Sequence, residues 1–250
     1  SAAKRQRTEV DKDDVMNASD IGTIAALSVE PDISLWKDKR AWHSQKFPRE
    51  AQVKGREREV QHLVHFDAVE DCDTPDEGDT VCDMIWVEEW RGDEVRSRLA
   101  VRQFRGEKRL DTFAAMPDSF FVRFQLLKCS ANKDFAVLII DVSVAFMHAD
   151  IEEEIKVKVP AGIESATGFW RLLKALNGTQ KASQSWCEHS ANIVTGWNAS
   201  RNDYSGAVFR LEDENIDIKQ HGDDFFGEGP RLEILKLRDK FAGGFMVKKA

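Results

Sequence analysis

The chain has 250 residues and a formal net charge of −8, and its 42% hydrophobic and 32% charged residues are typical of a globular protein, which excludes a disordered or fibrous chain. No run of eighteen apolar residues and no secretory signal sequence occur, so we expect no contact with a membrane. The cysteines are far apart without a Cys-x-x-Cys motif, as expected of free thiols in a reducing intracellular compartment: Cys72, Cys82, Cys129 and Cys187.

The N-terminal stretch is polar, and we expect a flexible tail over residues 1–34, followed by one folded unit over 35–250. The basic run at residues 4–7 is either a nuclear localisation signal or a solvated end. Because the sequence begins with Ser1 and not with methionine, we expect it to be a piece of a longer product.

Apolar residues at helical spacing predict a helix over residues 53–69. His62 and His65 lie within it, and their spacing without a nearby cysteine favours two surface histidines over a zinc site. An acidic loop containing Pro and Gly is expected at 71–79.

Two alternating segments with a Gly-containing turn between them predict a β-hairpin over residues 81–104. Arg96, Arg98 and Arg102 alternate along its second strand and so share one face. A solvated strand face is the alternative to a phosphate-binding one.

The charge is unevenly distributed around this hairpin. Residues 67–94 hold twelve acidic residues and one basic residue, whereas residues 95–110 hold six basic residues and one acidic residue. Phosphates respond to charge within a Debye length of about 10 Å. The net charge of −8 therefore argues only weakly against nucleic acid as a partner.

Further elements are predicted along the second half of the chain. A branched apolar run indicates a buried strand over 137–141, ending in Asp141, with small residues and Phe146 after it. Asp141 is alternatively a capping residue after a core strand, and Phe146 alternatively a core residue. Helices are expected at 120–128, at 183–196 and from Pro230 onward, and strands at 208–211 and 216–221.

Asp223 and Asp224 lie between an alternating segment and an apolar pair, which predicts a tight hairpin turn with both acids at its tip. Two adjacent carboxylates are either solvated or held together by a cation. Asp141, about eighty residues away, would complete a set of three carboxylates. Such a set can hold two Mg²⁺ ions about 3.5–4 Å apart for phosphoryl transfer.

Five blocks in the same order resemble the reverse transcriptases of copia-type LTR retrotransposons. The match covers residues 81–241. It rests on Arg98 to Phe104, Asp111-Thr112-Phe113-Ala114, Asp141-Val142-Ser143-Val144-Ala145-Phe146 with the following residues to Gly162, Ala175 to Trp186, and His221-Gly222-Asp223-Asp224.

The resemblance implies an α/β (α+β) fold with fingers at about 81–135 and a palm at about 136–250, the palm being a small antiparallel sheet backed by helices. It implies RNA-directed DNA polymerase activity, in which a primer 3′-hydroxyl attacks a dNTP with two Mg²⁺ or Mn²⁺ ions. By resemblance, the catalytic residues and metal ligands are Asp141, Asp223 and Asp224, with the backbone carbonyl of Val142 as a further ligand. The dNTP-binding residues implied are Arg96, Arg98, Phe146, Asn177 and Gly178, with Phe146 excluding ribonucleotides.

The resemblance also implies partners: an RNA or DNA template-primer and the thumb, RNase H and integrase of a Pol polyprotein, acting in a cytoplasmic particle or the nucleus. Asn177 replaces the family's Tyr and Gly222 its Val, and Lys219 and Gln220 lie in a normally apolar strand. The thumb and RNase H are expected beyond this sequence. Two alternatives remain open at this point: an inactive remnant that keeps the palm fold, and an unrelated Mg²⁺-dependent phosphotransferase or nuclease.

Overall fold

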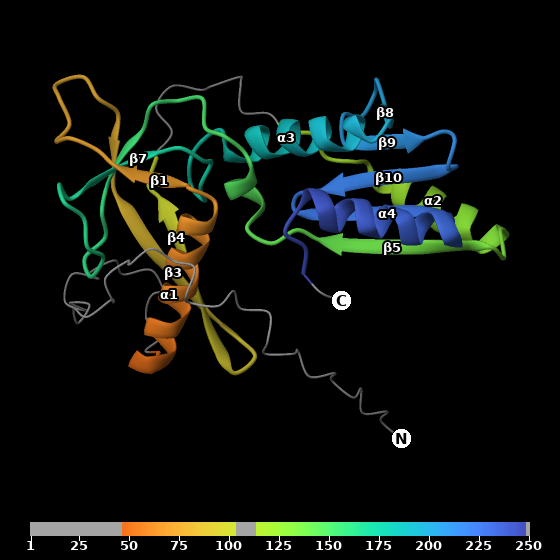
Figure 1. Ribbon diagram of the computed structural model, residues 1–250. Helices are drawn as coiled ribbons and strands as arrows, with labels where there is room; N and C mark the ends of the chain where they lie inside the picture. The colour runs from red at the N-terminus through yellow and green to blue at the C-terminus, as the bar shows by residue number, and fades with distance from the viewer. Residues whose placement is uncertain (1–46, 104–113, 249–250) are drawn as a thin grey trace.

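The computed structural model describes residues 47–103 and 114–248, which form two lobes side by side (Figure 1). The expected tail at 1–34 lies outside the described residues. The described part of the hairpin lobe contains one helix and six strands: α1 (Arg49–His65), β1 (Val69–Asp71), β2 (Val81–Cys82), β3 (Met84–Arg91), β4 (Glu94–Val101), β6 (Lys156–Lys158) and β7 (Phe169–Leu172).

The sheet lobe contains a five-stranded antiparallel sheet in the order β5-β11-β10-β9-β8, with three helices. Its elements are α2 (Ser119–Ala131), β5 (Phe135–Asp141), α3 (Ala182–Gly196), β8 (Ser200–Arg201), β9 (Val208–Leu211), β10 (Ile216–His221), β11 (Asp224–Pro230) and α4 (Arg231–Gly244). A short 3-10 helix, Ala145–His148, follows β5. The mixed α+β fold with a small antiparallel sheet backed by helices is thus confirmed.

The chain passes between the lobes more than once. In the hairpin lobe, β3 pairs with β4, and a separate sheet has the order β1-β7-β6-β2. Because β6 and β7 come after β5 in the chain, the segment 156–172 returns from the sheet lobe to pack in the hairpin lobe. Val157 and Trp170 of this segment, with the preceding Ile155, share a core with Leu63 and Leu99.

Most predicted elements are confirmed, and α1 differs at both ends. This helix starts at Arg49 and stops at His65, so the predicted end at 69 was wrong. Asp67 takes a left-handed φ of 47°, which stops the helix, and Val69 then begins β1. His65 is exposed as expected, whereas His62 is half-buried beside Glu59.

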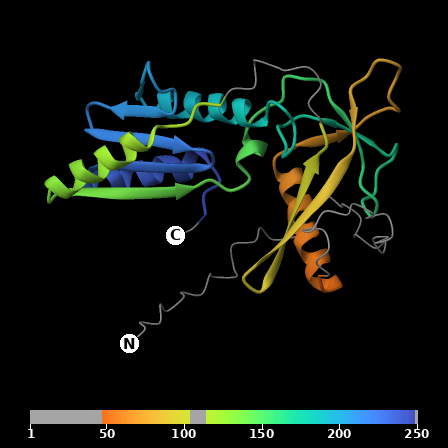
Figure 2. The same ribbon diagram turned by 180° about the vertical axis from the view of Figure 1, so that it is seen from behind.

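The two faces of the five-stranded sheet differ in character. One face packs against α3 and α4, and its core includes Ile216, Ile218, Phe225 and Phe241. The opposite face meets α2, which lies behind the sheet in Figure 1 and in front of β5 in Figure 2. Because strand side chains alternate, Asp141, Lys219 and Asp224 fall on this second face.

Candidate active site

The site begins at the β10–β11 hairpin. His221 pairs with Asp224, so Gly222 and Asp223 form a two-residue turn. Gly222 has a left-handed φ of 62°, as such turns require. The predicted hairpin is confirmed with Asp223 in its turn, whereas Asp224 is the first residue of β11.

Strand register brings Asp141 to this hairpin. Asp224 lies directly opposite Asp141 on β5, so the two carboxylates extend from the same face of neighbouring strands. The amide of Val142 donates a hydrogen bond of 3.0 Å to the carbonyl of Asp223. The main chain therefore joins the end of β5 to the turn and brings Asp141 to the adjacent residues Asp223 and Asp224, which are distant from it in the sequence.

Buried groups support the turn from behind. The indole Nε1 of Trp186 donates to the carbonyl of Gly222 at 2.8 Å, and the amide of Gln220 donates to the same carbonyl at 3.2 Å. Ser190 on α3 donates to the amide oxygen of Gln220 at 2.9 Å. Gln220, a departure from the family's apolar strand, is therefore satisfied although only 1% exposed.

The electrostatics of the acids are those of a crowded anionic site. The pKa of Asp224 is raised, first by burial and then by the charges of Asp223 and Asp141. The Nζ of Lys248 forms an ion pair with Oδ2 of Asp141. The other oxygen of Asp141, Oδ1, is buried and has no hydrogen-bond partner.

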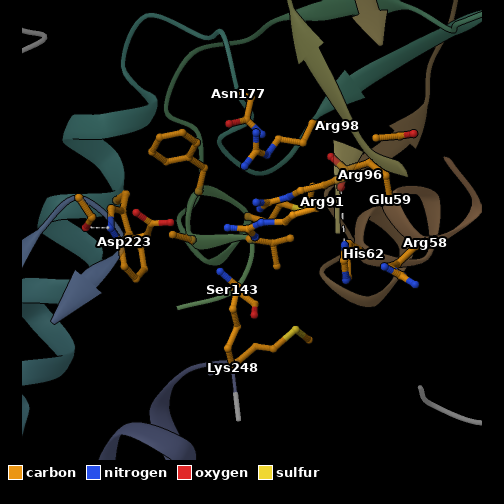
Figure 3. Close-up of a pocket in the computed structure, with 18 of the residues that line it drawn as sticks. Arg58, Glu59, His62, Arg91, Arg96, Arg98, Ser143, Asn177, Asp223 and Lys248 are labelled. Atoms are coloured by element: carbon orange, nitrogen blue, oxygen red, sulfur yellow. Dashed lines mark hydrogen bonds and ion pairs between the residues drawn. The ribbon is translucent and has the colours of Figure 1, made fainter. Parts of the chain in front are cut away.

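A cavity of about 790 Å³ opens between the lobes, and its walls carry opposite charge. Asp223 lies on the sheet-lobe side, and Arg91, Arg96 and Arg98 extend into the cavity from the hairpin β3–β4 (Figure 3). Asn177 lies at the upper rim in this view. The cavity has room for a nucleotide-sized ligand, whose sites commonly measure about 300–1,000 Å³.

The arginine wall is partly neutralised. Arg98 pairs with Glu89 across the hairpin at 3.3 Å, and its side chain is 34% exposed. The pKa of Arg96 is lowered, first by burial and then by the charges of Arg98 and Arg91. Mutually repelling guanidinium groups in one cavity favour the binding of a polyanion. The predicted sharing of one face holds for Arg96 and Arg98, whereas Arg102 follows the end of β4.

Asn177 and Gly178 connect the lobes. Asn177 lines the cavity, and its carbonyl accepts a hydrogen bond of 2.7 Å from the amide of Val101. Gly178 has φ of 87°, and a Cβ there would lie 2.1 Å from the carbonyl oxygen of Val101. Gly178 is absent from the cavity lining and holds the loop against β4. Its implied contact with a dNTP stays a prediction.

Phe146 lies on the short helix after β5. Its side chain is partly buried, packs against two core clusters and also lines the cavity. Val144, just before this helix, has a left-handed φ of 45°, which is rare for a β-branched residue and costs about 1–3 kcal/mol. This strained turn redirects the chain after Asp141 and places Phe146 at the cavity.

Sequence reasoning missed several cavity residues, namely Arg58, Arg91, His62 and Lys248. Arg91 closes the predicted hairpin, so its position beside the turn was an available signal. Lys248 reaches Asp141 over a separation of 107 residues, for which the sequence carries no local signal. Within 47–103 and 114–248, no group of three or more His, Cys, Asp or Glu side chains is arranged to hold a metal ion.

Family comparison gives this site its context. Residues 85–249 match the family model for reverse transcriptase (RNA-dependent DNA polymerase), and the chain belongs to that family. A stretch of 97 residues, 36% of the chain, is 33% identical to the retrovirus-related Pol polyprotein from transposon TNT 1-94 of Nicotiana tabacum. The chain spans about 7% of the length of this relative.

These matches confirm the resemblance to a copia-type reverse transcriptase domain and the RNA-directed DNA polymerase region that it implied. No helix among the described residues is both long enough and apolar enough to span a membrane. α1 precedes the residues that match the family model, yet it supplies Arg58 and His62 to the cavity.

Proposed function

We propose that the cavity binds a deoxynucleoside triphosphate and that the three acids at its edge serve nucleotidyl transfer from it to a primer 3′-hydroxyl, directed by an RNA or DNA template. The observation that carries this proposal is the opposition of charge in one cavity. Asp223 faces Arg91, Arg96 and Arg98 across a nucleotide-sized space, and the Asp141–Asp224 pair lies next to Asp223 outside the cavity lining. The acids fit cations, and the arginines fit a triphosphate.

The carboxylate chemistry of the acid edge fits divalent cations, although the acids are not grouped around a metal position in the described residues. Asp141 offers a buried oxygen without a hydrogen-bond partner, and burial together with the charges of Asp223 and Asp141 raises the pKa of Asp224. Asp141, Asp223, Asp224 and the carbonyl of Val142 would hold two Mg²⁺ or Mn²⁺ ions. When bound, such ions stabilise the charge that develops on the attacking and leaving oxygens. The chain's own contribution is to fix these carboxylates through strand register.

The remaining cavity residues would select and orient the nucleotide. Arg96 and Arg98 would bind the phosphates, and Asn177 lies at the rim above them. The ring of Phe146 would lie against C2′ of the sugar and exclude a 2′-hydroxyl. Gly178 would act through the loop that it anchors on Val101.

The relative is a Pol polyprotein, and we propose that this chain likewise works beside a thumb, RNase H and integrase. Such a protein would act inside the cell, in a cytoplasmic particle or in the nucleus. An inactive remnant would keep the fold without binding metal or nucleotide. An unrelated phosphotransferase or nuclease would bind metal without preferring deoxynucleotides.

Nucleotide binding tests the cavity directly. We expect Arg98→Met to weaken the binding of dGTP with Mn²⁺ by about tenfold, because hydrogen bonds to charged groups are worth about 1.5–3 kcal/mol. Arg171→Met is the matched control, since Arg171 forms an exposed ion pair with Glu70 on β1, away from the cavity. Calorimetric titration of both variants measures the difference. Equal affinities for the two variants and the wild type would show that the triphosphate does not bind in this cavity.

The sugar preference tests Phe146. We expect Phe146→Ala to bring the affinities for dGTP and GTP together, because removing the ring makes room for the 2′-hydroxyl. If the ring is only part of the core, its removal would instead cost about 3–5 kcal/mol of stability and would weaken the binding of both nucleotides equally. An unchanged dGTP-to-GTP ratio in a folded variant contradicts the assignment.

A further inference from the structure

The segment after α4 folds back onto the end of β5. The amide of Ser143 donates to the carbonyl of Met246 at 2.8 Å, and the amide of Lys248 donates to the carbonyl of Asp141 at 3.0 Å. Between these two bonds, Val142 and Val247 form an antiparallel bridge. The main chain therefore fixes Lys248 beside Asp141, independently of what its side chain does.

The side chain of Lys248 then makes a specific contact. Its Nζ pairs with Oδ2 of Asp141, and both side chains are about one-third exposed, at 35% and 37%. Lys248 also lines the cavity, near Ser143 on the side below the arginines in Figure 3. The ammonium group is thus at the mouth of the acid edge, where water and ions can reach it.

This contact places the positive charge of Lys248 beside Asp141, one of the acids proposed to hold a cation. Asp141 and Asp224 are neighbours across two strands, and like charges in that position repel each other. An ammonium group within contact distance offsets the repulsion, since the attraction between two opposite charges falls with distance and with solvent screening. A divalent cation at the same carboxylate would offset the same repulsion.

We propose that Lys248 is a built-in counterion of Asp141 that holds this carboxylate in the metal-free protein and competes with the divalent cation for it. This inference rests on the proposed function of the three acids. Lys248 is accordingly a positioning residue: it acts through Asp141, and cation binding at Asp141 proceeds with release of the Lys248 ammonium.

A purely structural ion pair and a counterion predict different results. If the pair only stabilises the fold, replacing Lys248 lowers the melting temperature equally with and without metal. If Lys248 competes with the cation, its replacement lowers the melting temperature without metal and tightens metal binding. A lower melting temperature without metal together with tighter metal binding is expected only in the second case.

The experiment compares Lys248→Met, Lys248→Arg and Asp141→Asn with the wild-type chain. Lys240→Met is the matched control, because Lys240 is equally exposed, at 36%, and forms an ion pair with Glu214 away from the acids. Free Mn²⁺ is measured by electron paramagnetic resonance to obtain Kd, and melting temperatures are recorded with and without Mn²⁺. We expect Lys248→Met to lower Kd about fivefold, the effect of one partly exposed ion pair. Lys248→Arg and Lys240→Met should stay near the wild-type value.

Two outcomes overturn the inference, and they are distinguishable. If Lys248→Met leaves Kd unchanged while Asp141→Asn abolishes binding, Lys248 is a structural partner and the proposed metal site stands. If Mn²⁺ binding does not depend on Asp141 in any variant, the proposed function and the inference fail together. A lower Kd in Lys248→Met with wild-type binding in Lys248→Arg supports the counterion.

Discussion

The two faces of the five-stranded sheet differ in the residues that they carry: one is apolar and the other is polar. The apolar face, with Ile218 and Phe225, packs against α3 and α4 and forms the main core. The polar face carries Asp141, Asp224 and the buried Lys219. Because successive residues of a strand point to opposite faces, one hairpin supplies both kinds of residue. The core residues and the proposed site residues therefore occupy alternate positions of the same strands.

The polar face is also where charges are buried. Lys128 on α2 forms ion pairs with Asp217 at 2.5 Å and with Glu228 at 2.8 Å. Burial raises the pKa of Glu228, whose side chain is fully buried. Lys219 is 2% exposed, its Nζ has no hydrogen-bond partner, and it lies 4.7 Å from the ring centre of Phe226. This face thus carries electrostatic costs that the apolar face does not.

The largest expected effect is on the apolar face. Phe225→Ala should lower the free energy of unfolding by about 3–5 kcal/mol, because Phe225 is 1% exposed and its ring packs against Phe241 and Phe245. Ile139→Ala on the polar face should cost less than about 0.5 kcal/mol, since Ile139 is 66% exposed. Urea unfolding of both variants measures the contrast. Similar losses would mean that the two faces contribute alike.

Low pH should lower the free energy of unfolding, because protonation of His148 is unfavourable in the folded protein. Its ring packs against Trp186 and Phe245, and burial lowers the pKa of His148 to about 4. The folded state favours the neutral ring, so stability falls as the pH drops below about 6.5 and continues to fall to about 4. Between pH 7 and pH 5 this group should cost about 2 kcal/mol.

The variant His148→Phe should lose this component of the pH dependence, whereas replacing the exposed His65 by Phe should keep it. Unfolding free energies at pH 7 and pH 5 give the comparison. If His148→Phe depends on pH as steeply as the wild type, groups other than His148 cause the loss of stability in acid.

On the polar face, a smaller effect on stability is expected from Lys219, and replacing this residue should stabilise the protein. Burial lowers the pKa of Lys219 to about 8, so the folded state disfavours the charged amine and stability rises as the pH increases from about 8 to about 10.5. Lys219→Met should therefore stabilise the protein at pH 7, by about 1 kcal/mol. The gain should shrink at pH 10.

Lys128→Met is the matched change on the same face, and it should destabilise the protein because Glu228 would be left buried without its partner. Thermal unfolding at pH 7 and pH 10 separates the two lysines. Destabilisation by Lys219→Met at both pH values would show that Lys219 has a compensating partner.

Local patterns predicted most of the elements, because strand alternation and turn residues act over a few positions. The bounds of β9 and β10 and the turn at Asp223 follow from such patterns. The end of α1 could not be predicted, since the left-handed Asp67 resembles an ordinary helical residue in sequence. The polar Gln220 in an otherwise apolar strand could not be explained from local sequence, because its partner Ser190 lies thirty residues away.

Within the candidate site, the acids were predictable and their surroundings were not. Asp141 and Asp224 meet because both lie on strands whose register is set by alternating burial. The cavity wall at Arg58 and the ion pair of Lys248 depend on contacts between distant segments. Such contacts arise from tertiary packing, which no spacing rule describes.

We propose that the polar edge of this sheet binds divalent cations through its three acids. The most direct test is the melting temperature with increasing Mn²⁺, in the wild type and in the Asp223→Asn, Asp224→Asn double variant. Because a ligand that binds only the folded state stabilises it by mass action, we expect the wild type to melt at rising temperature as Mn²⁺ increases. The double variant should show no such rise. An equal rise in both proteins would place the cations elsewhere and contradict the account.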